Sequence, residues 1–192
     1  MGKTKRIRRG ESVLVVIDLQ ERLMPAMCGG QAVEAAAGRL IRGFGILGAP
    51  VVVTQQYTKG LGPTVAPIME ALKAAALPAA GPAPAIEKIS FSAAGAPEFI
   101  KGLEATGRRS VAICGIEAHV CVMQTALDLI DAGYSVYVAA DAISSRKESD
   151  MAAALRRMEA AGAIATTSEA ILFEMLEGAG ESGFKEISAL VK

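Results

Sequence analysis

Short apolar runs, mostly of β-branched residues, alternate along this chain with longer segments rich in Ala and Leu, and this alternation restricts the fold more than any other feature. The runs lie at 12–18, 50–55, 85–89, 110–116, 135–141 and 163–167. They are almost continuous in apolar residues, which is typical of parallel strands buried on both faces. We therefore predict a parallel sheet with these segments as its strands.

The segments between the runs have helical periodicity. We predict helices near 31–48, 65–76, 97–106, 120–132, 148–161 and 168–177. Gly107 and Gly133 stand where a helix should end before a strand, and Pro97 suits a first helical turn. Consecutive strand–helix units predict an open, doubly wound α/β sheet with right-handed crossovers and helices on both faces. A (β/α)₈ barrel needs more units than this chain provides.

The length of 192 residues favours one domain, which we assign to residues 11–192. The Gly-, Pro- and Ala-rich stretch 77–84 is interpreted as a loop inside that domain. Residues 1–10 hold five basic residues and no acidic one, and we interpret them as a basic arm, tag-like or disordered. Because the net charge of the chain is zero, the other 182 residues carry −5, which argues against a nucleic-acid partner.

The first apolar stretch, 13–17, ends at Asp18 and is too short for a signal-peptide core or a membrane helix. The three cysteines, Cys28, Cys114 and Cys121, are odd in number and show no framework spacing. That usage favours a reducing compartment, so we predict a cytoplasmic protein that has no membrane partner.

Polar residues follow the predicted strands at positions where an open α/β sheet binds ligands, outside the carboxyl ends of its strands. Asp18 ends the first run, Lys88 lies in the third, and Cys121 lies in the turn after the fourth. A helix N-terminus and a nearby lysine both favour the thiolate form of a cysteine. A carboxylate can take the thiol proton and later return it to a leaving group. We therefore predict one catalytic crevice that contains these three side chains.

Each of these residues taken alone has a structural interpretation. Asp18 could cap a turn, Lys88 could be a solvated surface residue, and Cys121 could pack in the core. Cys114, in the middle of a strand, is interpreted as a buried apolar residue, and Cys28 lies in a polar loop. Because a carboxylate, an ammonium and a thiol coincide at equivalent strand ends, a catalytic role is the better interpretation.

Longer segments around these positions resemble the cysteine hydrolases of the isochorismatase-like superfamily. They are VLVVIDLQERL, the lysine of EKISFSA, and GIEAHVCVMQTALDLIDAGYSVYVAADAISSR. TQQYTKGLGPTV and the terminal FKEI are similar to the isochorismatase-domain-containing branch. The resemblance implies a six-stranded parallel sheet in the order 3-2-1-4-5-6 with helices on both faces, which sets strand one beside strand four. It also implies a catalytic triad of Asp18, Lys88 and Cys121.

The resemblance further implies hydrolysis of an amide-like or carbamoyl C–N bond in two stages. Cys121 attacks the carbonyl carbon with Asp18 as general base, an amine or ammonia leaves, and water resolves the thioester. A cis peptide bond in the family corresponds to Ile116–Glu117 here, and the backbone N–H groups of Glu117 and Cys121 would bind the oxyanion.

The partner is expected to be a small-molecule substrate. The pocket for this substrate is predicted to be lined by Leu23, Tyr57, Phe91 and Glu117.

The sequence also departs from relatives that use other chemistry. Nicotinamidases of this superfamily hold a metal with an Asp and two His, whereas His119 is the single histidine of this chain. We therefore predict no metal and no other cofactor, with Gln55, Gln56 and Tyr57 giving neutral hydrogen bonds and an apolar wall instead. True isochorismatases lack the cysteine, so Cys121 argues against vinyl-ether cleavage. His119 is interpreted as a capping or packing residue rather than the base.

Two other classes of protein remain alternatives. One is a catalytically retired domain that acts as a binding or scaffold protein, and the other is a thiol redox protein, although the chain has no Cys-x-x-Cys. Charged residues make up only 21% of the chain, and the segments 31–48 and 148–161 are rich in alanine. Apolar area on such helices favours association, so we predict a homo-oligomer, a dimer or tetramer.

Overall fold

The computed structural model describes residues 6–75 and 84–192. Its strands are β1 (Ser12–Ile17), β2 (Val51–Gln56), β3 (Ile86–Lys88), β4 (Ser110–Ile116), β5 (Ser135–Ser144) and β6 (Ile164–Thr166). Its α-helices are α1 (Gly30–Ile46), α2 (Thr58–Leu61), α3 (Ala66–Ala75), α4 (Pro97–Ala105), α5 (Met123–Asp131), α6 (Glu148–Ala160), α7 (Ser168–Leu176) and α8 (Phe184–Leu190). Short 3₁₀ turns, η1 (Met24–Ala26) and η2 (Ala93–Gly95), and a π-helical turn, η3 (Ala118–Val122), complete these elements.

The strands form one six-stranded sheet in the order β3-β2-β1-β4-β5-β6, and every neighbouring pair is parallel. The predicted fold class and strand order are therefore confirmed. β1 lies between β2 and β4, with Ile17 opposite both Thr54 and Gly115. The direction of winding reverses at this point, so the ends of β1 and β4 lie next to each other at the edge where such sheets bind ligands.

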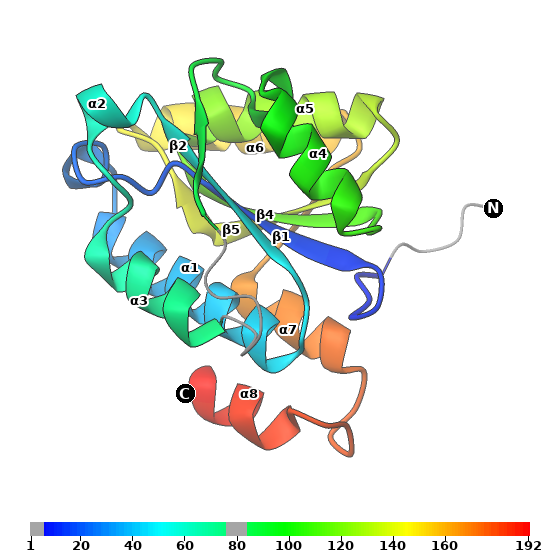
Figure 1. Ribbon diagram of the computed structural model, residues 1–192. Coiled ribbons are helices and arrows are strands. Elements are labelled where there is room, and N and C mark those ends of the chain that lie inside the picture. The colour runs from blue at the N-terminus through cyan, green and yellow to red at the C-terminus, as the bar shows by residue number, and fades with distance from the viewer. Residues whose placement is uncertain (1–5, 76–83) are drawn as a thin grey trace.

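Helices cover both faces of the sheet (Figure 1), and each face has its own apolar core. On one face α1, α3 and α7 cover the sheet, and α8 packs against α1 and α7. On the other face lie α4, α5 and α6. Alternate residues of β1 serve the two cores: Leu14 and Val16 face the first, and Val13 and Val15 face the second. This two-sided burial explains why the strand sequence is continuously apolar.

Gly115 allows β1 and β4 to approach each other closely at the switch point. Its backbone φ is 130°, and a Cβ built there would lie 2.1 Å from the Ile17 carbonyl oxygen. Any side chain would therefore push β4 away from the residue that precedes Asp18.

The predicted strands and helices agree with the structure to within a few residues, with specific exceptions. β5 continues to Ser144, three residues beyond the predicted end. The helix predicted at 120–132 is preceded by η3, so Cys121 lies in a π-helical turn rather than a regular helix start. α2 and α8 were not predicted as helices, because segments of four and seven residues are too short to show clear periodicity.

The basic arm extends less far than predicted. Ile7 is 1% exposed and belongs to the core on the α1 face, and the Arg9 guanidinium donates a hydrogen bond to the Leu47 carbonyl at 2.6 Å. Residues 6–10 are thus part of the folded domain, because an isoleucine between arginines gives this segment an apolar anchor. Residues 1–5 and most of the predicted loop 77–84 lie outside the described residues.

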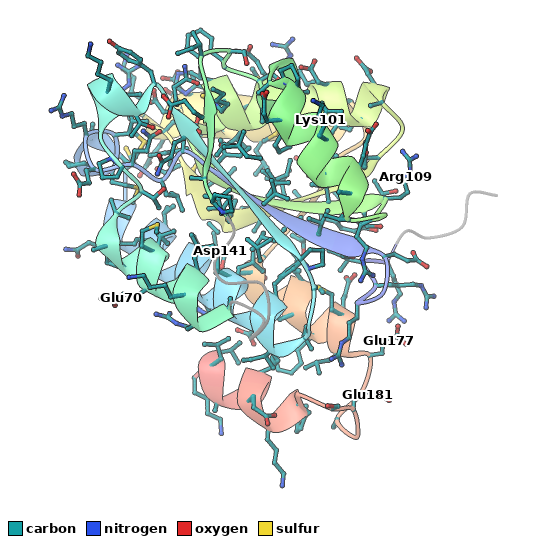
Figure 2. The ribbon with its side chains drawn as sticks, viewed as in Figure 1. Glu70, Lys101, Arg109, Asp141, Glu177 and Glu181 are labelled. Atoms are coloured by element: carbon teal, nitrogen blue, oxygen red, sulfur yellow. The ribbon has the colours of Figure 1, made fainter. Side chains whose placement is uncertain are left out.

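The outer faces of the helices carry the charged side chains. Figure 2 shows Glu70 on α3 and Lys101 on α4 at the periphery, and both residues are exposed. In the described part of the chain, we find no helix that combines the length and the apolar character needed to span a bilayer.

Candidate active site

Asp18 follows β1 directly and is completely buried at the carboxyl edge of the sheet. Its backbone is left-handed, with φ 52°, which turns the chain away from the strand direction. The Thr54 hydroxyl donates a hydrogen bond to Oδ1 at 2.7 Å, and the Lys88 ammonium lies 2.7 Å from Oδ2. Each carboxylate oxygen thus has one strong partner, so the side chain is fixed in position.

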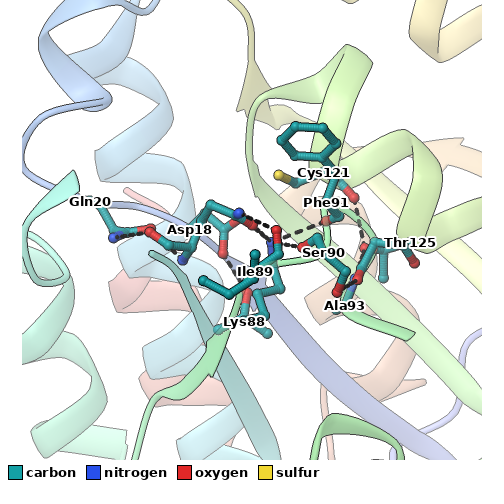
Figure 3. A network of polar contacts seen from close by, with 12 residues as sticks. Asp18, Gln20, Lys88, Ile89, Ser90, Phe91, Ala93, Cys121 and Thr125 are labelled. Atoms are coloured by element: carbon teal, nitrogen blue, oxygen red, sulfur yellow. Dashed lines mark hydrogen bonds and ion pairs between the residues drawn. The ribbon is translucent and has the colours of Figure 1, made fainter. Parts of the chain in front are cut away.

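Lys88, the last residue of β3, is buried beside Asp18 (Figure 3). Its ammonium donates to Asp18 Oδ2, to the Gln56 side-chain oxygen at 2.6 Å, and to the carbonyls of Phe91 at 3.0 Å and Ser90 at 3.3 Å. A buried ammonium is stable only when its donors are paired, and here oxygen atoms surround it. The alternative interpretation of Lys88 as a solvated surface residue is therefore excluded.

Cys121 lies in η3 with 6% of its surface exposed. Burial, together with the Asp18 charge, raises the pKa of the Cys121 thiol to about 12, although the Lys88 charge acts in the opposite direction. The Lys88 charge thus favours the thiolate in the expected direction, but removal from water and the Asp18 charge disfavour the thiolate by more.

The structure thus brings Asp18, Lys88 and Cys121 together: Asp18 and Lys88 form an ion pair, and both of their charges act on the Cys121 thiol. Sequence reasoning missed Thr54, which completes the contacts of the acid, and it named Gln56 without its contact to the lysine. Both residues are polar and two positions apart at the end of a buried strand. That spacing puts them on one face of β2, so this signal could have identified them.

A second missed residue, Thr125 of α5, fixes the turn that carries the thiol. Its hydroxyl donates to the Cys121 carbonyl at 2.7 Å and accepts from the Ala93 N–H at 2.9 Å. Thr125 thereby connects the segment after Lys88 to η3, the turn that carries the Cys121 thiol.

Glu117 separates β4 from η3, and the Ile116–Glu117 peptide bond is cis. The Glu117 carbonyl accepts hydrogen bonds from the N–H groups of Val120 and Val122, which closes the turn. Its own N–H has no hydrogen-bond acceptor among residues 6–75 and 84–192. An N–H group that is free in this position can bind an anion.

His119 points to the end of β5 rather than to the triad. Its Nδ1 lies 2.9 Å from the Ser145 hydroxyl, and its Nε2 lies 4.0 Å from the Asp150 carboxylate. These contacts agree with a packing role and give the imidazole no direct path to the Asp18 carboxylate.

The predicted pocket residues differ in their placement. Tyr57 and Phe91 are exposed, and their backbones lie against Lys88: the Tyr57 N–H donates to the Lys88 carbonyl, and the Phe91 carbonyl accepts from the ammonium. Leu23 packs against the core of the α1 face, whereas Cys121 belongs to the core of the α4–α6 face. The Glu117 side chain is bound by Arg146 at 2.9 Å. The role of these residues in substrate binding stays a prediction.

Gln55 and Gln56 form neutral hydrogen bonds through their side-chain amides. The Gln55 amide donates to the Thr64 hydroxyl at 2.8 Å, and the Gln56 amide donates to the Ile89 carbonyl at 2.6 Å. Within the described ranges, no three His, Cys, Asp or Glu side chains are grouped as metal ligands. The three cysteines are free thiols.

Comparisons with known proteins agree with this architecture. A family model described as Isochorismatase domain matches residues 12–170. Isochorismatase domain-containing protein 2 of Xenopus laevis is 38% identical over 195 residues, 100% of this chain and 90% of that protein. Isochorismatase domain-containing protein 1 of Danio rerio is 41% identical over 182 residues, which cover 94% of this chain and 61% of that longer protein.

Solved structures show the same fold. MAR1 ribonuclease from Caenorhabditis elegans superposes with a TM-score of 0.89 at 39% identity, covering 97% of this chain and 92% of that one. YcaC of Escherichia coli, described as an octameric hydrolase of unknown specificity, gives a TM-score of 0.88 at 22% identity and covers 99% and 92% of the two chains. At that identity the likeness concerns the fold alone. The family model and the curated relatives show that the chain belongs to the isochorismatase domain family.

Proposed function

We propose that this protein is a metal-independent cysteine hydrolase that cleaves a small amide-like or carbamoyl C–N bond through a thioester. One observation carries the proposal: a buried carboxylate, paired with a buried lysine, acts on the thiol of Cys121. The carboxylate is positioned to accept a proton, and the thiol is the nucleophile that would lose it.

In the proposed reaction, Cys121 Sγ attacks the carbonyl carbon while its proton passes to Asp18. The C=O π electrons move to the oxygen, and the backbone N–H groups of Glu117 and Cys121 stabilise the resulting oxyanion. Collapse of this intermediate breaks the C–N bond, and Asp18 returns the proton to the leaving amine. Water, deprotonated by Asp18, then attacks the thioester carbonyl. The C–S bond breaks, a carboxylic or carbamic acid is released, and Asp18 returns the proton to the Cys121 sulfur.

The raised pKa of the Cys121 thiol agrees with this order of reaction steps. At neutral pH the resting protein holds a protonated thiol beside an acceptor, because burial and the Asp18 charge both disfavour the thiolate. Proton transfer therefore accompanies attack on a bound substrate. A thiol of this kind is protected from unspecific oxidation and alkylation between turnovers.

A second candidate function is phosphodiester cleavage, because the C. elegans relative bears the name MAR1 ribonuclease. Binding of RNA requires cations that can contact phosphate groups. The Lys88 ammonium is instead surrounded by protein oxygens, and Arg146 is paired with Glu117. The arrangement therefore favours C–N hydrolysis. A retired scaffold is disfavoured because the acid, lysine and thiol all remain connected.

The test is ammonia and amine release from a panel of small amides, ureides and carbamoyl compounds, with an RNA oligonucleotide as a separate arm. Wild type should turn over at least one C–N substrate and trap a thioester of matching mass on Cys121. Cys121→Ala should retain its circular dichroism spectrum and lose this activity. Cys114→Ala is the matched control, because that cysteine faces the core on the other side of the sheet. Hydrolysis by Cys121→Ala at the wild-type rate, or cleavage of RNA alone, contradicts the proposal.

We further propose that the protein assembles as a homo-oligomer, a dimer or tetramer. The low charged fraction of 21% supports this, since a monomer of this size exposes much surface to water. The octameric assembly is a property of the E. coli protein and indicates only that this fold can associate.

A further inference from the structure

The segment Ser144–Arg146, at the end of β5, connects η3, the turn that carries Cys121, to the loop before α1. On one side, the Cys28 N–H donates to the Ser145 carbonyl at 3.0 Å, and the Ser144 hydroxyl donates to the Cys28 carbonyl at 2.6 Å. The Cys28 thiol also donates to the Arg146 carbonyl at 3.1 Å. These bonds tie the backbone of the segment to Cys28.

On the other side, Arg146 holds the carboxylate of Glu117. Its Nε–H donates to Glu117 Oε2 at 2.9 Å, and its backbone N–H contributes a longer bond to the same oxygen at 3.4 Å. The arginine side chain is 62% exposed, whereas the Glu117 side chain is only 13% exposed. The glutamate is therefore held at the buried end of the pair by two donors of a single residue.

Glu117 also determines the geometry of the turn that carries the thiol. Its carbonyl accepts the N–H groups of Val120 and Val122, while its own N–H has no acceptor in the described ranges. Clamping the side chain leaves little freedom for this peptide to rotate. Both contacts of Arg146 thus act on the residue whose N–H is free.

We propose that Arg146 is a positioning residue: it orients the Glu117 N–H toward the oxyanion that forms when Cys121 attacks the substrate. This inference rests on the proposed function, because an oxyanion forms only if a carbonyl group is attacked. Arg146 touches no reacting atom. Its guanidinium also adds a positive charge near the developing negative charge, but its exposure makes that contribution small.

The steady-state experiment compares wild type with Arg146→Ala, Arg146→Lys and the control Arg157→Ala, which changes an exposed arginine on α6. Removing a complete oxyanion donor typically costs about 10²–10³ in rate, so a misaligned donor should lower kcat about tenfold or more. KM should change little, since the donor acts mainly on the tetrahedral intermediate. Arg146→Lys should recover part of the loss, and Arg157→Ala should match wild type.

Alkylation of Cys121 by iodoacetamide separates positioning of the hole from general loosening of the turn. The thiol attacks the methylene carbon, iodide leaves, and no oxyanion forms. The rate at Cys121, followed by peptide mass spectrometry, should therefore be the same in Arg146→Ala and wild type, while acylation by the amide substrate slows. Equal slowing or acceleration of both reactions assigns Arg146 a merely structural role and overturns the inference, as does an unchanged kcat.

Failure of the proposed function gives a different result. If wild type hydrolyses no C–N substrate, or Cys121→Ala remains active, the mechanism itself is wrong. If wild type is active, Cys121→Ala is inactive and Arg146→Ala is as active as wild type, then the proposed function stands and only the positioning role of Arg146 is wrong.

Discussion

The Lys88 ammonium lies 2.7 Å from the Asp18 carboxylate, and neither side chain is exposed to solvent. Two strands that are not neighbours in the sheet, β1 and β3, thus contribute opposite charges to one buried contact across β2. Such a pair is stable only when its remaining donors and acceptors have hydrogen-bond partners. Here Thr54 donates a hydrogen bond to the carboxylate, and Gln56 accepts one from the ammonium. The ion pair holds the acid at a fixed position relative to the thiol.

Asp18→Asn should slow hydrolysis by about 10²–10⁴, the usual contribution of a positioned base, because an amide cannot take the thiol proton. The same change should accelerate alkylation of Cys121 by iodoacetamide at pH 8–9. Asp18 raises the pKa of the thiol and Lys88 lowers it, so neutralising the acid lowers that pKa and increases the thiolate fraction. Hydrolysis above about a tenth of wild type would show that another group is the base, and slower alkylation would contradict the predicted fall in the thiol pKa.

The buried thiol of Cys114 should make the protein less stable in alkali. Burial, with a smaller contribution from Asp141, raises its pKa well above the ordinary value of 9.0. The raised pKa means that the native state keeps a proton which the unfolded chain loses above pH 9, so the free energy of unfolding falls as pH rises further. The loss is at most about 1.4 kcal/mol per pH unit for this thiol.

Urea denaturation under reducing conditions at pH 8 and pH 10.5 measures this effect. Cys114→Ala should be less stable than wild type at pH 8, because the substitution leaves a small cavity. Its stability should nevertheless fall less between the two pH values. Identical declines for the two proteins would assign the alkaline instability to other groups.

Treatment with a chelator should leave the proposed hydrolysis unchanged. His119 is the single histidine of the chain and contacts Ser145, and the reaction uses a carboxylate and a thiol for proton transfer and attack. The measurement is activity before and after dialysis against EDTA, combined with elemental analysis. Stoichiometric zinc, iron or manganese, with activity lost on its removal and restored on its return, would be incompatible with this mechanism.

Light scattering should give a mass at least twice that of the 19.8 kDa chain at low-micromolar concentration. An ordinary stable interface buries about 800 Å² per subunit, which the apolar helix surfaces could supply. A constant mass near that of one chain across a dilution series would contradict the predicted dimer or tetramer.

The sequence by itself determined the parallel sheet, because strands buried on both faces must be apolar at every position and helices must alternate with them. It also placed Asp18, Lys88 and Cys121 at one edge, since the carboxyl ends of parallel strands point the same way. The resemblance to a known family supplied the strand order that makes β1 and β4 neighbours.

Other properties depended on residues far apart in the sequence. The packing of Ile7 in the core and the closure of β1 on Gly115 are long-range contacts that no local pattern encodes. The Glu117–Arg146 pair likewise joins segments 29 residues apart. The raised pKa of the Cys121 thiol depends on the tertiary structure alone. Local sequence indicates which charges lie near a thiol, but the extent of its burial, which raises the pKa most, follows only from the packing of the whole chain.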